Sequence, residues 1–322
     1  MKKLGIVLSG LIACGLWGSI GQAQNYPSAP MRMVVPYAAG GGADTTARVL
    51  SRKMAEDLGQ PIVVENRVGA SGVIAATHVV KAAADGHTLL MMTAGEAVQP
   101  VLRRNLPYDL LTDLVPVSLV GISPFVLVVH PSVPAKTVDE LIALARANPG
   151  KLNFGSSGIG TSPHLAGELF AMMSKTKLTH IPYKGGSQAA TATVSGEIEI
   201  SFPATTSAIP QVQAGKIRAL AVTTSRRTRF MPALPTLDES GLRGFERSSW
   251  YALMAPAGIS NNIVSRLNAA ILKALNAPEV ARVFEAQGIE SVGNTPEQLS
   301  AFIRAEMKQN AAIVEAAGIK PE

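Results

Sequence analysis

The stretch MRMVVPYAAGGGAD, residues 31–44, joins a short apolar run to a glycine-rich turn. An apolar run of this length that ends at Pro36 is typical of a buried strand. The apolar residues between positions 45 and 58 then recur at helical spacing, and Gly59 follows as a stop signal. Strand, tight turn and helix in this order predict the first half of a βαβ unit.

The same alternation continues along the chain. Strands are expected at residues 61–64, 88–92, 117–120, 125–129, 152–154, 198–202 and 219–222. Helices are expected at residues 73–84, 138–147, 163–173, 207–214, 263–275, 279–287 and 296–317. This pattern predicts an α/β protein with two lobes, each with a mainly parallel sheet flanked by helices. The second unit is embedded in the first, so lobe 1 is expected to hold residues 24–124 and 226–322, and lobe 2 residues 125–225.

Composition excludes several classes of protein. Hydrophobic residues make up 47% of the 322 residues and charged residues only 16%, which excludes disorder of the low-hydrophobicity kind. The net charge is +6, and the densest basic cluster is Arg226, Arg227 and Arg229. No aromatic residues interleave with a basic stripe, so we expect no nucleic-acid partner. A mild positive field suits a small anion instead.

The beginning of the chain has the pattern of an export signal. Lys2 and Lys3 precede an apolar run from Leu4 to Ile20, and Gly21-Gln22-Ala23 offers small residues for a cut before Gln24. This predicts a signal peptide over residues 1–23 and a location in the periplasm. The alternatives are a retained membrane anchor, or a lipoprotein tethered through Cys14, which follows a lipobox-like Leu11-Ile12-Ala13.

The glycine-rich turn is the first of three predicted anion sites. Glycine permits positive φ and leaves backbone N–H groups exposed, and a helix N-terminus carries partial positive charge. We expect Asp44 to cap the helix and Gly41 to need a conformation open to glycine. The alternative is a helix start in which glycine only tightens the turn. The candidate ligand residues here are Pro36, Tyr37, Ala39, Gly40, Gly41, Gly42 and Asp44.

Two further strand-to-helix junctions resemble the first in composition. In the second, GSSGIGTSPH at residues 155–164, Ser162 is expected to be the N-cap residue with Pro163 at the first helical position. Its hydroxyl groups can bond a carboxylate, and His164 is either a ligand group or a capping histidine. The third junction carries one cation, Lys184. The candidates at these two junctions are Ser156, Ser157, Gly160, Thr161, Ser162, His164, Tyr183 and Lys184.

Motifs of the common enzyme classes are missing from the sequence. The glycines at 40–42 lack the further glycine of a dinucleotide-binding turn, and no Walker A motif is present. Residues 155–159 fail the nucleophile elbow because the fifth residue is not glycine. The histidines are isolated, without a close metal-binding pair. We therefore expect no catalytic residue, no cofactor and no metal. The alternative is an exported enzyme, because the fold can bring catalytic groups together from distant positions in the sequence.

Several of these motifs, in this order, resemble the Bug family, the periplasmic binding components of tripartite tricarboxylate transporters. The resemblance runs from Tyr26-Pro27 to the C-terminus. It rests on VVPYAAGGG at 34–42 (the family usually has Phe at Tyr37), VENR at 64–67, LPYD at 106–109, GTSPHLAGE at 160–168, PYKG at 182–185, SWY at 249–251 and APAG at 255–258.

The resemblance implies a type II periplasmic binding fold whose lobes close over a small organic carboxylate in the cleft between them. The first two junctions would act as pincers on that carboxylate. The protein would be monomeric and would deliver its ligand to a membrane transporter, or alternatively to a membrane sensor. One stretch departs from the family: Pro203-Ala204 stands where an acidic residue and Asn are frequent. Thr205, Thr206 and Ser207 follow and could substitute, and a less polar acid is favoured over an amino acid or citrate.

Overall fold

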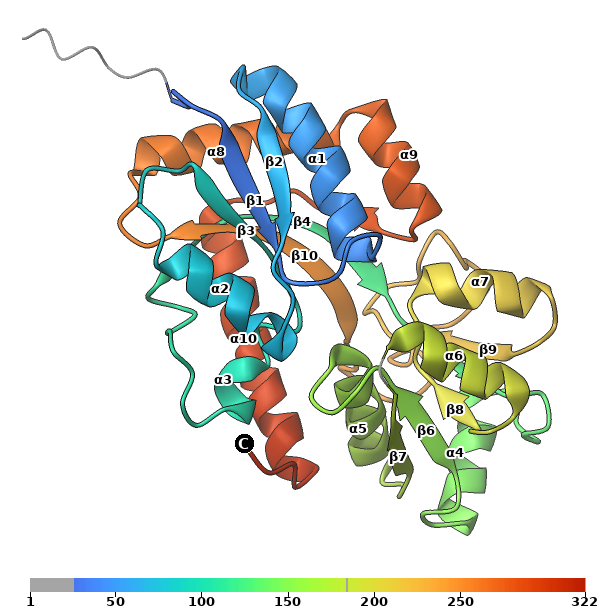
Figure 1. The fold of residues 1–322 in the computed structure, drawn as a ribbon. Helices are drawn as coiled ribbons and strands as arrows, with labels where there is room; N and C mark the ends of the chain where they lie inside the picture. Colours follow the sequence, from blue (N-terminus) through green and yellow to red (C-terminus); the bar gives the residue numbers. More distant parts are fainter. Residues whose placement is uncertain (1–25, 184, 322) are drawn as a thin grey trace, which may run out of the picture.

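The computed structural model describes residues 26–183 and 185–321, which form two sheets with helices on both faces (Figure 1). The predicted leader, with Cys14, lies outside the described residues. The strand order is β11-β4-β10-β3-β1-β2 in the first sheet and β7-β6-β8-β5-β9 in the second. We call each sheet with its covering helices a lobe. The predicted α/β fold with two sheets is thereby confirmed.

The first sheet has a parallel part and an antiparallel part. The parallel part is formed by β1 (Met31–Val35), β2 (Ile62–Asn66) and β3 (Thr88–Thr93). The antiparallel part is formed by β4 (Leu114–Pro124), β10 (Ser248–Pro256) and β11 (Glu290–Ser291). Strands β3 and β10 are buried along almost their whole length, which explains the continuous apolar runs at residues 89–92 and 250–256.

Side chains that alternate along β1 divide the first lobe into two cores. Met31, Met33 and Val35 face α1 (Gly42–Leu58), α8 (Asn261–Leu275) and α9 (Pro278–Ala286). Val34 faces the opposite core, which contains α2 (Val73–Val80) and the first half of α10 (Pro296–Ala316). Two short helices, η1 (Ala70–Gly72) and α3 (Gln99–Leu102), follow β2 and β3.

The second sheet is also mixed. Strand β6 (Asn153–Ser156) is parallel to β7 (Thr179–Pro182) and β8 (Ile200–Ser201), whereas β5 (Val126–Val129) is antiparallel to β8 and β9 (Arg218–Val222). The helices of this lobe are α4 (Val138–Ala147), α5 (Ser162–Ser174), α6 (Gly186–Ser195) and α7 (Thr205–Gln213). The prediction that each sheet is mainly parallel is therefore wrong, because parallel pairing is confined to the strands around β1 and β6. Those strands precede the candidate junctions.

The chain crosses between the lobes twice, and both crossings meet at Thr223. Strand β4 ends one residue before β5 begins, and the segment after β9 returns to the first sheet as β10. The Thr223 hydroxyl accepts a 3.1 Å bond from the Phe125 N–H and lies 2.6 Å from the Arg247 carbonyl. The Arg247 N–H in turn donates to the Thr223 carbonyl at 2.9 Å. One fully buried side chain therefore joins the two crossing segments.

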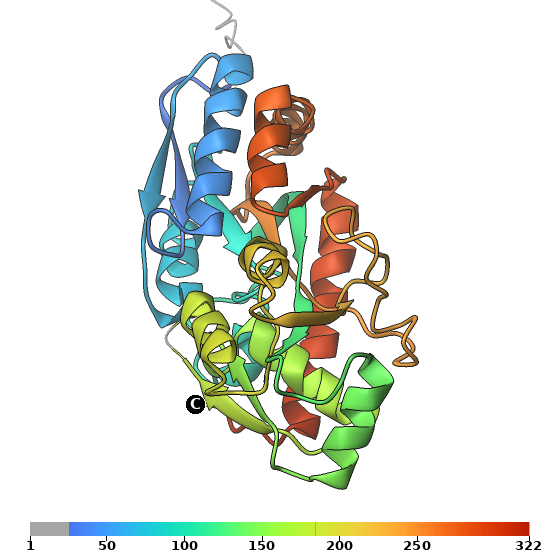
Figure 2. The same ribbon diagram turned by 90° about the vertical axis from the view of Figure 1, so that its right-hand side faces the viewer.

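Helix α10 also spans both lobes, as the turned view in Figure 2 shows. Leu299 and Ile303 belong to a core of the first lobe, whereas Ile313 and Val314 pack into the core of the second. Beside the crossing, the buried Arg247 side chain donates to Gln309 at 2.9 Å. In the described part of the chain, no helix is long and apolar enough to span a bilayer.

Replacing Thr223 with valine tests the crossing. The change preserves shape but leaves the Phe125 N–H and the Arg247 carbonyl without their buried partner, at about 1–3 kcal/mol for each group. We expect the free energy of unfolding, measured by urea titration, to fall by at least about 2 kcal/mol.

The matched control is Thr46→Val, since the Thr46 hydroxyl is buried and has no hydrogen-bond partner among the described residues. This change should be neutral or stabilising. Equal losses in the two variants would contradict the role given to Thr223.

Candidate functional site

The first junction, between β1 and α1, owes its course to glycine. Gly41 is the N-cap residue of α1, and its φ of −75° is open to any residue. The prediction that Gly41 needs a glycine conformation is therefore wrong: the left-handed residue is Gly40, with φ of +82°. Gly42 is required by a close approach, because a Cβ atom there would lie 2.6 Å from the Tyr251 hydroxyl oxygen.

Asp44 is the side chain that holds this loop in place. It lies at the third position of α1 and accepts hydrogen bonds from the Gly40 N–H, Arg48 Nε and Asn66 Nδ2, each at 2.9 Å. The bond from Arg48 and those from Gly40 and Asn66 lower the pKa of Asp44 to about 2. Asn66 also donates to the Tyr37 carbonyl at 2.9 Å. Asp44 is therefore a support of the loop, with its buried carboxylate already satisfied.

The backbone donors of the junction remain available. Within the described residues, the N–H groups of Gly42 and Ala43 form no hydrogen bond, as is usual in the first turn of a helix. Gly42 is exposed, and so is Ala39, whereas Pro36 is buried beneath the loop. Ala43 is buried, so the N–H group of Gly42 is the exposed one of the two. Free donors at the positive end of a 17-residue helix are suited to an anion.

The Tyr37 side chain points down from the loop toward the end of β3. Its hydroxyl oxygen lies 3.5 Å from Thr93 Oγ1, and a Cβ atom on Gly95 would lie 2.3 Å from that oxygen. Burial raises the pKa of Tyr37 well above its usual value, so the phenol is neutral. Tyr37 therefore forms part of the floor under the loop.

A buried acid, Glu96, completes this floor, and sequence reasoning missed it. It accepts bonds from the Thr93 N–H at 2.7 Å and the Thr93 hydroxyl at 2.8 Å, both on Oε2. The other oxygen, Oε1, is buried without a partner in the described part of the chain. Burial raises the pKa of Glu96 to about 7. Gly72 leaves room for this carboxyl group, since a Cβ atom there would lie 1.6 Å from Oε1.

The second junction, between β6 and α5, keeps its shape through its own hydroxyl groups. Thr161, and not Ser162 as predicted, is the N-cap residue, and its hydroxyl donates to the Gly158 carbonyl at 2.7 Å. Ser156 Oγ accepts from the Gly158 N–H at 3.1 Å. These two hydroxyls are therefore engaged inside the loop. The half-buried Ser157 hydroxyl and the Ser162 N–H have no partner among the described residues, so they are open to a ligand.

His164 lies behind the second junction rather than in front of it. It is buried, and its Nδ1 accepts a 3.0 Å bond from the N–H of Gly160. This leaves the proton on Nε2, which lies 3.4 Å from Glu168 Oε1. The ring stacks on His180 with centroids 3.9 Å apart. Burial, together with His164, lowers the pKa of His180 to about 3, so His180 is neutral. The histidine pair supports the loop as an uncharged stack.

The third junction offers a ligand fewer free polar groups than the first two. The Tyr183 hydroxyl donates to Glu197 Oε1 at 2.8 Å, and burial together with this carboxylate raises its pKa to about 12. Lys184 lies outside the described residues. Thr205, a possible contact to the far end of a ligand, is buried and donates to the Gly288 carbonyl at 3.1 Å. It therefore joins the two lobes, and its hydroxyl is not available.

The first two junctions lie on sides of the sheets that face each other (Figure 1). Parallel strands bring their carboxyl ends to one edge of a sheet, which explains how β1 and β6 present their loops there. No group of three or more His, Cys, Asp or Glu side chains in the described part of the chain is arranged to hold a metal ion. The arrangement is suited to binding an anion through backbone N–H groups and a few hydroxyls.

Glu96 makes stability depend on pH in a defined direction. Its pKa is 4.5 in an unfolded chain and about 7 in the folded protein, so the folded state binds more protons between these values. The contribution of Glu96 to the free energy of unfolding is complete below pH 4.5 and is lost as the pH rises to about 7. Glu96→Gln should remove this loss, which amounts to about 3 kcal/mol.

Urea unfolding of the parent and of Glu96→Gln at pH 5 and pH 8 measures the difference. Other titrations are common to both proteins and cancel. If the two proteins lose the same stability between pH 5 and pH 8, Glu96 is charged throughout and the assignment is wrong.

Comparison with known proteins agrees with this geometry. Residues 46–319 match the family described as tripartite tricarboxylate transporter family receptor. The chain is 38% identical to protein BugT of Bordetella pertussis over 322 residues, which covers 99% of each chain. A solved R. palustris protein with adipate is 34% identical, with a TM-score of 0.80 over 92% of this chain and all of that one. The malate-bound MatC of Rhodopseudomonas palustris is 32% identical, with a TM-score of 0.76 over 90% of this chain and all of MatC.

The likeness to BugT extends over nearly the whole chain, and the family match spans most of it, from residue 46 to residue 319. The predicted resemblance is confirmed: this chain belongs to the Bug family of tripartite tricarboxylate transporter receptors.

Proposed function

We propose that the chain is a periplasmic receptor that binds a small organic carboxylate between its lobes and delivers it to the membrane components of a tripartite transporter. The observation that carries the proposal is the pair of facing helix N-termini with unoccupied N–H groups, at Gly42 and Ala43 and at Ser162. The carboxylate nearest to the first of them, Asp44, is tied to Arg48, Gly40 and Asn66. The site is thus left open to an anion from outside.

The ligand is a carboxylate with an apolar body. Solved relatives carry adipate and malate. In this chain Pro203 is buried and the Thr205 hydroxyl is engaged by Gly288, so only the hydroxyls of Thr206 and Ser207 remain as candidate polar partners in this stretch. A buried hydroxyl or amino group on the ligand that these two hydroxyls do not reach would be left without a partner, at a cost of about 1–3 kcal/mol. Adipate is therefore the better first probe.

Binding by closure follows from the position of the junctions on different lobes. A ligand that contacts both junctions stabilises the arrangement in which they are close together.

The lobe division 24–124 plus 226–322 and 125–225 stays a prediction, as do the monomeric state, cleavage of residues 1–23 and the lipoprotein alternative at Cys14. Delivery to a membrane sensor instead of a transporter is the second candidate, and a pull-down of the mature protein with each membrane partner separates the two.

Adipate titration tests binding and closure together. Isothermal titration should give a single site, and the melting temperature should rise with adipate concentration by mass action. Small-angle scattering should show a more compact protein at saturation. Tight binding with an unchanged scattering curve would contradict closure, and absence of binding by adipate, malate and longer dicarboxylates would contradict the proposed ligand class.

Gly41→Val tests the first junction directly. The φ of −75° accepts valine. A Cβ atom would lie 3.3 Å from the Ala38 carbonyl oxygen, a tight contact, but the exposed loop should relieve it by a small shift, so we expect the variant to fold. The valine side chain would crowd the N–H groups of Gly42 and Ala43, and adipate affinity should fall at least tenfold, or about 1.4 kcal/mol.

The matched control is Ala277→Val, which changes the N-cap residue of α9, where φ is −74°, outside the site. It should leave adipate affinity unchanged. A folded Gly41→Val protein that binds adipate as tightly as the parent would show that the glycine-rich turn is only a helix start.

A further inference from the structure

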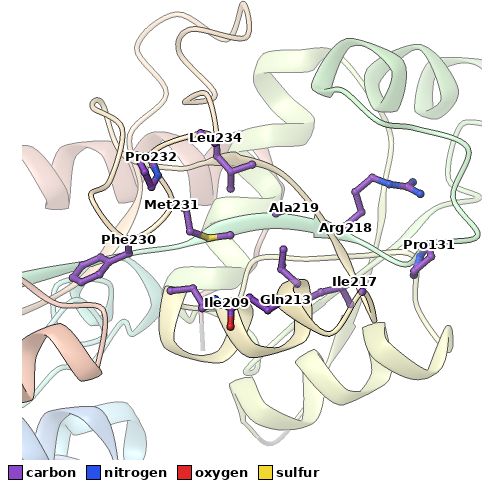
Figure 3. A pocket seen from close by; sticks show the side chains of 13 residues that line it. Pro131, Ile209, Gln213, Ile217, Arg218, Ala219, Phe230, Met231, Pro232 and Leu234 are labelled. Atoms are coloured by element: carbon purple, nitrogen blue, oxygen red, sulfur yellow. The ribbon is translucent and has the colours of Figure 1, made fainter.

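A pocket of about 530 Å³ opens at the edge of the second sheet, separate from the junctions (Figure 3). It lies along β9, the last strand of that sheet, between α7 and the segment 230–234. Figure 3 shows its labelled side chains spread along the groove from Phe230 at one end to Pro131 at the other. Most of the lining is apolar, with Ile209, Val212, Ile217, Met231 and Leu234 among its members.

The walls of this pocket are held in place without a ligand. At the start of α7, Thr205 is bonded to the Gly288 carbonyl, and just before segment 230–234 Thr228 donates to Glu290 Oε1 at 2.7 Å. Arg218 Nη1 donates to the carbonyls of Val133 at 3.1 Å and Ala135 at 2.9 Å, which fixes the strand side. A preformed apolar cavity of this volume is in the range of small-molecule sites, about 300–1,000 Å³.

The one charged side chain that lines the pocket, among the described residues, is basic. Arg218 lines the pocket, and Lys216 lies in the sequence between two residues that line it, Gly215 and Ile217. The Arg229 guanidinium lies 4.9 Å from the centre of the Phe230 ring. Arg227 is paired with Glu239 at 2.9 Å, whereas Lys216, Arg218 and Arg229 form no ion pair within the described residues. Within the part of the chain that the structure describes, no acidic side chain lines the pocket. Unpaired cations beside an apolar floor attract a molecule with an apolar body and a negative group.

We propose that this pocket is a second ligand site, independent of the junctions, for a small amphipathic anion such as a medium-chain fatty acid. The apolar body lies between α7 and the segment 230–234, and the anionic group is held by the cations at the rim. A concave cavity of this size favours a small molecule over a protein partner, whose interface would need about 800 Å² on each side. The proposal does not rest on the carboxylate site between the lobes.

Decanoate, kept below its micelle concentration, is the probe. Calorimetry should show decanoate binding to the mature protein, and also to Gly41→Val, in which the junction is blocked. Val212→Trp, which fills the pocket, should weaken binding at least tenfold. Phe230→Ala, at the half-buried end of the groove, serves as the second variant if Val212→Trp fails to fold. Loss of decanoate binding in Gly41→Val alone would show that decanoate enters the junction site, and the proposal would fail.

The charge requirement has its own control. Lys216→Gln should weaken decanoate binding a few-fold, while Lys151→Gln, the same change at an exposed site elsewhere in this lobe, should not. Decanol should bind more weakly than decanoate. Equal binding of decanol and decanoate, or equal effects of the two lysine variants, would overturn the anionic part of the proposal. Retention of full affinity in both pocket variants would overturn the site itself.

Discussion

The carboxylate of Asp44 is the interaction on which the proposed site depends. A negative side chain in the first turn stabilises a helix, yet an acid free to move at this position would occupy the N–H groups that a ligand needs. The structure resolves this conflict by giving both Asp44 oxygens protein partners, Arg48 and Gly40 on one and Asn66 on the other. With a pKa lowered to about 2, the carboxylate keeps its charge and its bonds across the physiological pH range. Helix α1 is therefore stabilised by an acidic residue in its first turn, while the N–H groups of Gly42 and Ala43 stay free of hydrogen bonds to the described residues.

The second junction also keeps backbone N–H groups free for a ligand, but without a charged supporting side chain. Here the Gly160 N–H is taken by a neutral histidine ring, and the Ser156 and Thr161 hydroxyls are bonded to the Gly158 backbone. The low pKa of His180 keeps positive charge out of the stack. A protonated ring beside the loop would attract an anion to the wrong side of it. One loop is thus supported by a satisfied acid and the other by an uncharged histidine stack, and in both the groups left free are on the backbone.

Features set by residues close together in the sequence can be predicted from it, whereas contacts between residues far apart in the sequence cannot. Most strands and helices and the glycine-rich junctions depend on local patterns, and the structure shows them close to the expected residues. The strands β7, β10 and β11 are exceptions, since the sequence pattern does not predict them. The partners of the loops come from distant elements: Asn66 is the last residue of β2, and His180 lies on β7. Pattern and spacing carry no signal for such contacts. The sequence therefore predicts Asp44 as a helix cap and candidate ligand group, and leaves His164 as either a ligand group or a capping histidine, whereas both support their loops. Glu96 was missed for the same reason, because an acid after an apolar strand looks solvated until tertiary contacts bury it.

The lobes are joined more tightly than two crossing segments alone would require. Thr223 ties both crossings together, α10 contributes to a core in each lobe, and the Thr205–Gly288 and Thr228–Glu290 bonds link the second lobe to the region before and within β11. A change in the angle between the lobes must either keep these contacts as a pivot or break them. Rotation about these contacts costs less than breaking them, because each buried polar group that loses its partner costs about 1–3 kcal/mol. Movement is then largest at the points farthest from Thr223, and the exposed tips of the first two junctions are the parts of the site free to approach a ligand.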